Sequence, residues 1–373
     1  MKISIAIPYL GEEEAEAAKQ VVLSGWVTQG PVVSQFEAKF AEVCNAKYAV
    51  AVSNGTTALH LSLLMAGVTG GDEVLCPSMS FIATANSIQY CGAKPVFCEV
   101  EDDYNISPKD ILKKITPKTK AILIVHQVGT PANLEEIAKI AKDNNLKIIE
   151  DAACAIGSKY NNEPIGSYSD TVCFSLHPRK IITTGEGGMI TTNSESIYNK
   201  LKLLRQHGMS INDQVRHNSK SVIVESYDVL GYNYRMTDIQ AAIGIEQLKK
   251  LDFIVSERRR QAAYYFDKLA MCKDLKLPLE RPYQYNNYQS FSITITNDRL
   301  SVMDIMQKLL DVGISSRRGI MLAHKEEPYK HLGLSLPISE KLAKESFLIP
   351  IYPGLSDEEL EYITTTLKKL LKS

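Results

Sequence analysis

Apolar positions between residues 48 and 151 form short continuous runs, and the segments between them carry apolar residues at helical spacing. In residues 133–145, for example, Leu134, Ile137 and Ile140 recur on one helical face. Repeated strand–helix–strand units with fully apolar strands predict a mostly parallel sheet covered by helices on both faces. The predicted strands are residues 48–53, 72–77, 94–100, 120–127 and 146–151, and the predicted helices are 34–44, 56–67, 81–92 and 133–145.

The pattern changes after about residue 240. A long helical stretch over 237–272 is followed by a short strand at 290–296 and a helix at 301–313, which is an α+β order. A chain of 373 residues is long enough for two domains of about 150 residues or more. We therefore predict a large α/β domain over residues 1–250 and a small α+β domain over residues 251–373, with the N-terminal segment free to pack on the small domain.

Charge and cysteine content narrow the class of protein. The 42 basic side chains nearly cancel the 43 acidic ones, and the net charge of −1 argues against a nucleic-acid-binding protein. The seven cysteines are odd in number and contain no C-x-x-C pair, which is typical of reduced thiols in the cytoplasm. No apolar run reaches the ~18 residues of a membrane span, and the histidine spacing does not favour a metal site.

Polar residues follow the predicted strands where a parallel sheet binds its ligands, beyond the carboxyl ends of the strands. Asp151 follows one strand, His126 follows another, and residues 53–57 ("SNGTT") follow a third. Lys180 comes just after the short strand "VCFSL", within the segment "FSLHPRKIITTGEGGMITT". A lysine and an aspartate are therefore expected at the same edge of the sheet.

These residue types match the needs of pyridoxal phosphate (PLP). That cofactor requires a lysine amine for its Schiff base and a carboxylate that keeps its ring nitrogen protonated, and Lys180 and Asp151 would fill those roles. Its phosphate requires backbone N–H groups at a helix start, which Gly55, Thr56 and Thr57 would supply, with Ser175 adding a hydroxyl.

Each of these features also has a simpler interpretation. A strand-end aspartate such as Asp151 is often a helix cap, and Arg179 with Lys180 reads equally well as a solvated pair of cations. The glycines of residues 185–188 would serve any tight turn. It is their joint order along an α/β chain that favours the cofactor site.

At these residues the chain resembles the DegT-type sugar-nucleotide aminotransferases, which have the aspartate aminotransferase fold (fold type I) of PLP enzymes. The resemblance runs almost end to end, and the motif "GISSRRGIMLAH" at residues 313–324 is similar to the perosamine-synthase branch. The matching motifs include "SGWVTQGPVVSQFEAKFAE", "AVAVSNGTTALHLSL", "PSMSFIATANSI", "IIEDAACAIGS", "FSLHPRKIITTGEGGMITT" and "GYNYRMTDIQAAIGIEQL".

The resemblance implies a role for each cofactor residue. Lys180 carries the cofactor, Asp151 pairs with its ring nitrogen, and the ring of Phe81 stacks on it. The implied phosphate ligands are Gly55, Thr56, Ser175 and, from the neighbouring subunit, Asn233. The last of these implies a homodimer with shared active sites.

Cys154 departs from the family pattern. It stands where the family usually has glutamine or histidine beside the ring hydroxyl of the cofactor. Because a thiol is a weak hydrogen-bond partner, that contact is in doubt, and a small residue packed against the sheet is an equal interpretation.

The implied reaction moves an amino group from an amino acid, by analogy glutamate, to the keto group of a nucleotide-linked sugar, with pyridoxamine phosphate (PMP) as the intermediate form. A 4-keto-6-deoxyhexose is the preferred acceptor. Candidate substrate contacts are Trp26, His177, Arg317, Arg318 and His324. For each of them a simpler role stays open. The two arginines could be solvated and bind no diphosphate, the two histidines could be structural, and the tryptophan could pack within the protein.

Three other functions compete with this prediction. A sugar dehydratase on the same scaffold has histidine in place of the Schiff-base lysine, and here that position is Lys180. A cyclitol ketone is a possible acceptor in place of the sugar. A regulatory protein with a PLP fold would act as a sensor or bind DNA, yet the sequence contains neither a basic stripe nor a separate helix-turn-helix segment.

Overall fold

The computed structural model describes residues 2–211 and 219–372. Within them, the central element is a seven-stranded sheet. In spatial order its strands are β1 (Tyr48–Val52), β9 (Gly188–Thr192), β8 (Thr171–Ser175), β5 (Lys147–Asp151), β4 (Thr119–Val125), β2 (Glu73–Pro77) and β3 (Lys94–Cys98). The α/β fold with a mostly parallel sheet is confirmed.

One strand of this sheet runs against the others. β9 is antiparallel to both of its neighbours, β1 and β8, whereas β8, β5, β4, β2 and β3 pair in parallel. The carboxyl ends of β1, β8, β5 and β4 therefore lie at one edge, together with the start of β9. That edge collects the polar strand-end residues of the sequence.

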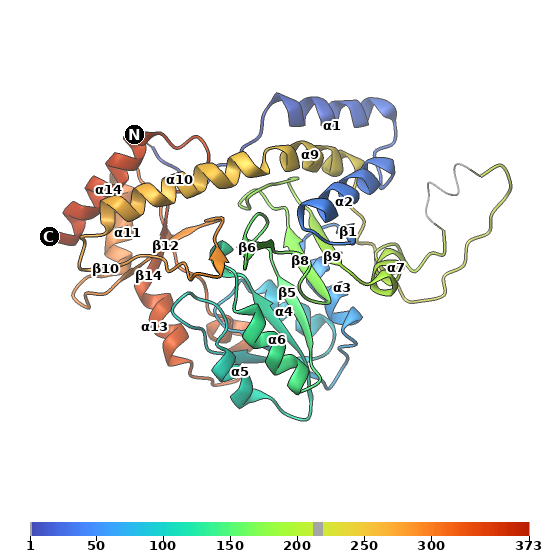
Figure 1. Cartoon of the computed structure of the whole chain (residues 1–373), viewed down its shortest axis with the longest axis horizontal. Coiled ribbons are helices and arrows are strands. Elements are labelled where there is room, and N and C mark those ends of the chain that lie inside the picture. The colour runs from blue at the N-terminus through green and yellow to red at the C-terminus, as the bar shows by residue number, and fades with distance from the viewer. Residues whose placement is uncertain (1, 212–218, 373) are drawn as a thin grey trace.

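Helices cover both faces of the sheet (Figure 1). On one face Phe36 of α2 and Ile137 of α6 pack with Ile254 of α10, and on the other Leu61 of α3 packs with Ile88 of α4. The helices of this part are α1 (Glu12–Ser24), α2 (Pro31–Val43), α3 (Gly55–Met65), α4 (Ala83–Tyr90), α5 (Pro108–Lys114), α6 (Leu134–Asp143), α7 (Glu195–Leu204), α9 (Asp238–Lys249) and α10 (Leu251–Leu269). None of the helices described is both long and apolar enough to cross a membrane.

The stretch predicted as one long helix is two helices, because the chain tightens at Lys250. The Lys250 N–H donates to the carbonyl of Gln247, three residues back, at 3.1 Å, which ends the regular four-residue spacing of α9. The Lys250 amine then reaches Glu14 of α1 at 2.8 Å. α10 continues from there to the C-terminal elements (Figure 1).

The C-terminal part builds its own apolar cluster around a four-stranded antiparallel sheet, ordered β10-β12-β14-β13. Ile3, from the start of the chain, is buried in that cluster and bridges to Ile314. The division at residue 250 stays a prediction. The elements here are β10 (Leu275–Lys276), β12 (Phe291–Ile295), α11 (Val302–Asp311), β13 (Arg317–Arg318), α12 (Glu327–Lys330), α13 (Pro337–Glu345), β14 (Ser346–Ile349) and α14 (Asp357–Lys372).

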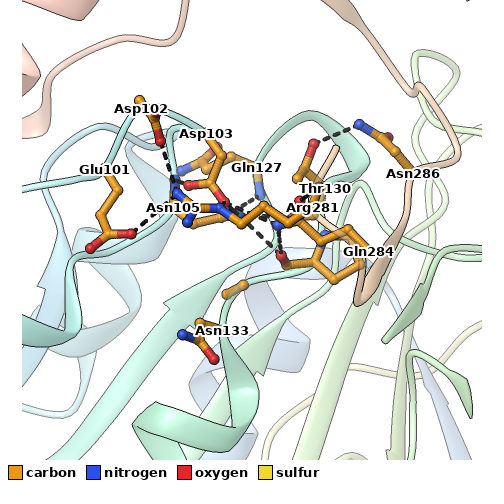
Figure 2. Close-up of polar contacts among 12 residues, drawn as sticks. Glu101, Asp102, Asp103, Asn105, Gln127, Thr130, Asn133, Arg281, Gln284 and Asn286 are labelled. Carbon is orange, nitrogen blue, oxygen red and sulfur yellow. Dashed lines mark hydrogen bonds and ion pairs between the residues drawn. The ribbon is translucent and has the colours of Figure 1, made fainter. Parts of the chain in front are cut away.

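Polar contacts tie the segment before β12 to the loops of the large sheet, as Figure 2 shows. Arg281 pairs with Asp102 at 2.8 Å, and Gln284 donates to Asp103 at 3.0 Å. Asn286 donates to the Thr130 hydroxyl at 2.6 Å. The same segment adds β11 (Gln284–Tyr285) to a small sheet with β6 (Lys159–Tyr160) and β7 (Glu163–Pro164). Residues 281–286 are thus anchored on the body that carries the site.

Candidate functional site

The N-terminus of α3 lies directly after the carboxyl end of β1. The Asn54 side chain caps this helix by accepting a hydrogen bond from the Thr57 N–H at 2.9 Å, so the helix begins at Gly55. The unpaired N–H groups of a first helical turn and the helix dipole favour an anion. This is the place where the sequence predicted a phosphate.

Two strand ends approach this helix so closely that only glycine fits. A Cβ added to Gly55 would lie 2.9 Å from the Cβ of Ser175 at the end of β8. A Cβ added to Gly188 would lie 2.3 Å from the carbonyl oxygen of Asn54. The two glycines therefore let the start of α3 and the Ser175 hydroxyl form one small cradle.

Asp151 ends β5 and is buried, with 6% of its surface exposed. Its carboxylate accepts hydrogen bonds from the Thr84 hydroxyl at 2.9 Å and from the Ala153 N–H at 3.1 Å. Burial raises the pKa of Asp151, and these two donors, with the charge of Lys180, offset that effect only in part. Among the described residues, no cationic side chain lies within ion-pair distance of it. A protonated ring nitrogen would supply the missing positive charge.

Lys180 lies in the loop between β8 and β9, where its N–H donates to the carbonyl of His177 at 2.8 Å. Its amine nitrogen is 3.2 Å from the sulfur of Cys154, which is three residues after Asp151 in the chain. The positive charge of Lys180 also lowers the proton affinity of Asp151. The structure therefore brings the predicted lysine and aspartate together at the carboxyl edge of the sheet, close enough for the charge of Lys180 to act on Asp151.

Phe81 precedes α4 and stands open to this edge, with 69% of its surface exposed. An exposed aromatic face at this edge is available for a flat ligand to stack on. The ring is free for the stacking role implied by the resemblance, which stays a prediction.

Asn233 is exposed and lies between two tyrosines. The Tyr232 and Tyr234 rings stack with their centroids 5.0 Å apart, and Tyr232 also meets His60 edge-on. The carbonyl of Tyr234 accepts the Ser53 N–H at 2.8 Å, which anchors the segment next to the start of α3. The role of Asn233 as a phosphate ligand in the site of the neighbouring subunit stays a prediction.

Two of the predicted substrate residues, Trp26 and His177, make local contacts in the structure. The Trp26 indole donates to the carbonyl of Gln29 at 3.3 Å and packs so tightly on Gly30 that a Cβ there would clash. His177 accepts the Arg179 N–H on Nδ1 at 3.2 Å, and burial lowers the pKa of its imidazole.

Arg317 and Arg318 form β13 and are exposed. Burial lowers the pKa of Arg317, and the charges of Arg179 and Arg318 lower it further. Arg318 also reaches Glu326 at 3.7 Å. Arg317, Arg318 and Arg179 therefore form a cluster of arginines. Arg179 immediately precedes Lys180 in the chain.

His324 and His126 are both buried, and both ring nitrogens of each have protein partners. His324 bonds the Ser78 hydroxyl through Nδ1 at 2.5 Å and Glu340 through Nε2 at 3.2 Å. Its predicted sugar contact stays a prediction, although no ring nitrogen is left for it. His126 pairs with Glu150 at 2.8 Å and accepts the Ala132 N–H, so it supports the sheet.

Sequence reasoning missed Thr84, Asn287 and Gln289. Thr84 lies in the motif "FIATANSI", one helical turn after Phe81, and that spacing is a signal that could have found it. Asn287 donates to the carbonyl of Cys154 at 2.8 Å, and Gln289 donates to the carbonyl of Arg179 at 2.8 Å. No local pattern in "YNNYQS" indicates these contacts.

With the geometry established, comparison with known proteins decides the family. The sequence profile of the DegT/DnrJ/EryC1/StrS aminotransferase family matches residues 8–368. The chain belongs to this family. It is 37% identical to the GDP-perosamine synthase of Escherichia coli O157:H7 over 98% of each chain. It is 36% identical to the GDP-perosamine synthase of Caulobacter vibrioides, over 99% of this chain and 98% of that one.

Solved structures agree with this DegT/DnrJ/EryC1/StrS assignment. The aminotransferase TlmJ from Streptoalloteichus hindustanus superimposes with a TM-score of 0.92 at 30% identity, covering 100% of this chain and 99% of that one. The Spr1654 protein of Streptococcus pneumoniae in its PLP form does so with a TM-score of 0.92 at 25% identity and the same coverage. The predicted family, the perosamine-synthase-like branch and the aminotransferase class are confirmed.

Proposed function

We propose that this DegT/DnrJ/EryC1/StrS aminotransferase uses PLP to move the amino group of an amino acid, glutamate, to the keto group of a nucleotide-linked sugar, a 4-keto-6-deoxyhexose. The observation that carries the proposal is that three groups meet at the carboxyl edge of the sheet: the Lys180 amine, the buried Asp151 carboxylate and the start of α3. The relatives named as GDP-perosamine synthases support a sugar nucleotide as the acceptor.

The residues present fit PLP. Gly55, Thr56 and Ser175 would hold its phosphate in the cradle that an added Cβ would fill. Asp151, whose buried carboxylate lacks a cationic partner among the described residues, would hold its ring nitrogen, and Phe81 would cover its face. When bound, the cofactor accepts the electrons of the bond that is broken at the α-carbon of the donor.

Lys180 would serve twice in this scheme. It would carry the cofactor at rest, and once the amino donor has replaced it, its Nζ would take the proton from the donor's α-carbon and return it to the cofactor. A negatively charged Asp151 would stabilise a positive charge on the cofactor ring. Both roles need the amine to stay within reach of the reacting carbon.

The arginine cluster would hold the diphosphate of the acceptor. Burial lowers the pKa of Arg317 most, and the charges of Arg179 and Arg318 lower it further, so an anion between the three arginines would relieve their repulsion. Arginine forks match the oxygens of a phosphate group. Arg179 immediately precedes Lys180 in the chain, so the cluster lies beside the lysine.

A homodimer with shared sites is part of the proposal. The described residues 219–230 run away from the body between α7 and α9 (Figure 1). Exposed apolar side chains gather there, at Val222, Val224, Tyr227 and Leu230. Apolar side chains on an extended segment favour burial against a second copy of the chain.

The test combines purified enzyme, glutamate and a panel of nucleotide-linked ketosugars and cyclitol ketones. We expect 2-oxoglutarate to form with a 4-keto-6-deoxyhexose nucleotide, and Lys180→Ala to abolish both turnover and the visible absorbance of bound PLP. Lys200→Ala, an exposed lysine of α7, is the matched control. Full turnover by Lys180→Ala would refute the proposal. Loss of a sugar hydroxyl without amination would indicate the dehydratase, and amination of a cyclitol ketone alone would indicate that rival acceptor.

A further inference from the structure

The sulfur of Cys154 faces the amine of Lys180 at 3.2 Å. A thiol is a weak donor and a weak acceptor at once. The contact can therefore form with a neutral amine, which accepts the S–H proton, and with a protonated amine, which donates to the sulfur. A carboxylate in this place could only accept hydrogen bonds, and its charge would favour the protonated form.

The short segment from Asn287 to Gln289 is hydrogen-bonded both to the backbone of Cys154 and to the backbone next to Lys180. Asn287 is fully buried, and its Nδ2 donates to the carbonyls of Cys154 and Ile156, each at 2.8 Å. Its Oδ1 accepts the N–H of Gln289 at 2.8 Å, and the Gln289 side chain donates to the carbonyl of Arg179, next to Lys180, at 2.8 Å. The backbones that carry Cys154 and Lys180 are thus fixed relative to each other.

We propose that Cys154 is a positioning residue for Lys180. Its thiol holds the amine toward the pocket whenever the lysine is not joined to the cofactor, and the segment from Asn287 to Gln289 sets the separation. The inference rests on the proposed function, because it needs a lysine that is repeatedly freed and joined. A free lysine side chain has four rotatable bonds, and the contact limits the conformations that its amine explores.

The step that reports this positioning is the joining of Lys180 to added PLP. The amine nitrogen bonds to the aldehyde carbon, and the aldehyde oxygen leaves as water with two hydrogens from the amine. Its rate depends on how often the amine lies within reach of the carbon. PMP carries no aldehyde, so it binds the same pocket without joining Lys180.

The first measurement is the stopped-flow rate at which cofactor-free enzyme captures PLP, followed by visible absorbance. We expect Cys154→Ala to slow capture about 3- to 10-fold, since the amine loses its partner. Cys154→Ser keeps a hydroxyl that can donate and accept, and it should stay within about 2-fold of the wild type. Cys272→Ala, a change at a partly exposed cysteine far along the chain, is the matched control and should change nothing.

The second measurement is the dissociation constant of PMP. It should stay within about 2-fold in Cys154→Ala if the thiol acts on Lys180 and not on the cofactor ring. Gln289→Leu, which removes the donor to Arg179, should slow capture in the same direction with PMP affinity retained.

Two results would overturn the inference. The first is an unchanged capture rate in Cys154→Ala, and the second is a loss of PMP affinity as large as the loss in rate, which would make Cys154 a cofactor contact. The Lys180→Ala variant distinguishes failure of this inference from failure of the proposed function. If Lys180→Ala still captured PLP, the proposed function itself would be wrong.

Discussion

The Thr84 hydroxyl donates to the Asp151 carboxylate at 2.9 Å and contacts the Ser80 hydroxyl at 2.7 Å. Because Ser80 immediately precedes Phe81, one buried hydroxyl joins the predicted ligand of the ring nitrogen to the loop that carries the predicted stacking ring. The carboxylate is thereby held by the same helix that positions the aromatic side chain.

Thr84→Val removes this hydroxyl at nearly constant volume. A hydrogen bond to a charged group contributes about 1.5–3 kcal/mol, so we expect the reaction of the enzyme with glutamate to be slower by at least about 10-fold. Thr84→Ser should restore the rate. Single-turnover absorbance measures it, with Ser87→Ala, a hydroxyl of the same helix that donates to a backbone carbonyl, as the control. A wild-type rate in Thr84→Val would contradict this role.

Asp151→Asn should stabilise the cofactor-free protein. Burial raises the pKa of Asp151, so the folded state binds its proton more tightly than the unfolded state. Stability contributed by this group is therefore present at low pH and is lost as pH rises from about 3.9, the unfolded value, through the folded pKa. At pH 7 we expect a higher Tm for the cofactor-free variant in calorimetry.

Added PLP should raise the Tm of Asp151→Asn less than that of the wild type, because the variant lacks the negative charge that would hold the ring nitrogen. Asp143→Asn, at an exposed acid of α6, is the control and should leave both values unchanged. A cofactor-free Asp151→Asn protein that melts below the wild type would show that the hydrogen bonds to the carboxylate outweigh its burial.

Gly55→Ala places a methyl group 2.9 Å from the Cβ of Ser175, so backbone or strand must shift. We expect a lower Tm for the cofactor-free protein and at least about 10-fold weaker PMP binding, because the cradle is filled. Ser175→Gly in the same chain removes the clash. The double variant should regain the Tm but not the affinity, since the Ser175 hydroxyl is gone; recovery of both would argue against Ser175 as a phosphate ligand.

Shared active sites predict complementation between two inactive variants. If Asn233 serves the partner's site, a mixed dimer of Lys180→Ala and Asn233→Ala chains has one site with both residues intact. Random reassociation should then give about a quarter of the wild-type activity. Unmixed samples and a mixture of Lys180→Ala with Asp151→Asn, whose defects lie in one chain's site, are the controls. No recovery, or a monomer by light scattering, would contradict the shared site.

The sequence by itself determined the elements and the chemistry at their ends. Continuous apolar runs and helical stripes are local patterns, so the strands that end near Val52, Asp151 and Ser175 and the helix that starts at Gly55 followed from them. The order of a lysine, an aspartate and a glycine-threonine helix start predicted the cofactor class, and the family comparison confirmed the aminotransferase. Local spacing was enough because strand ends of a parallel sheet meet at one edge.

The tertiary structure alone decided which side chains meet across that edge. Three contacts join segments whose separation in the chain carries no periodic signal. They are those of Thr84 with Asp151, Cys154 with Lys180, and Asn287 with the backbone of Cys154. The antiparallel return of β9 and the contact of Lys250 with Glu14 also join distant segments. Propensity and periodicity describe neighbours along the chain, whereas these contacts are selected by packing and by the pairing of buried polar groups in three dimensions.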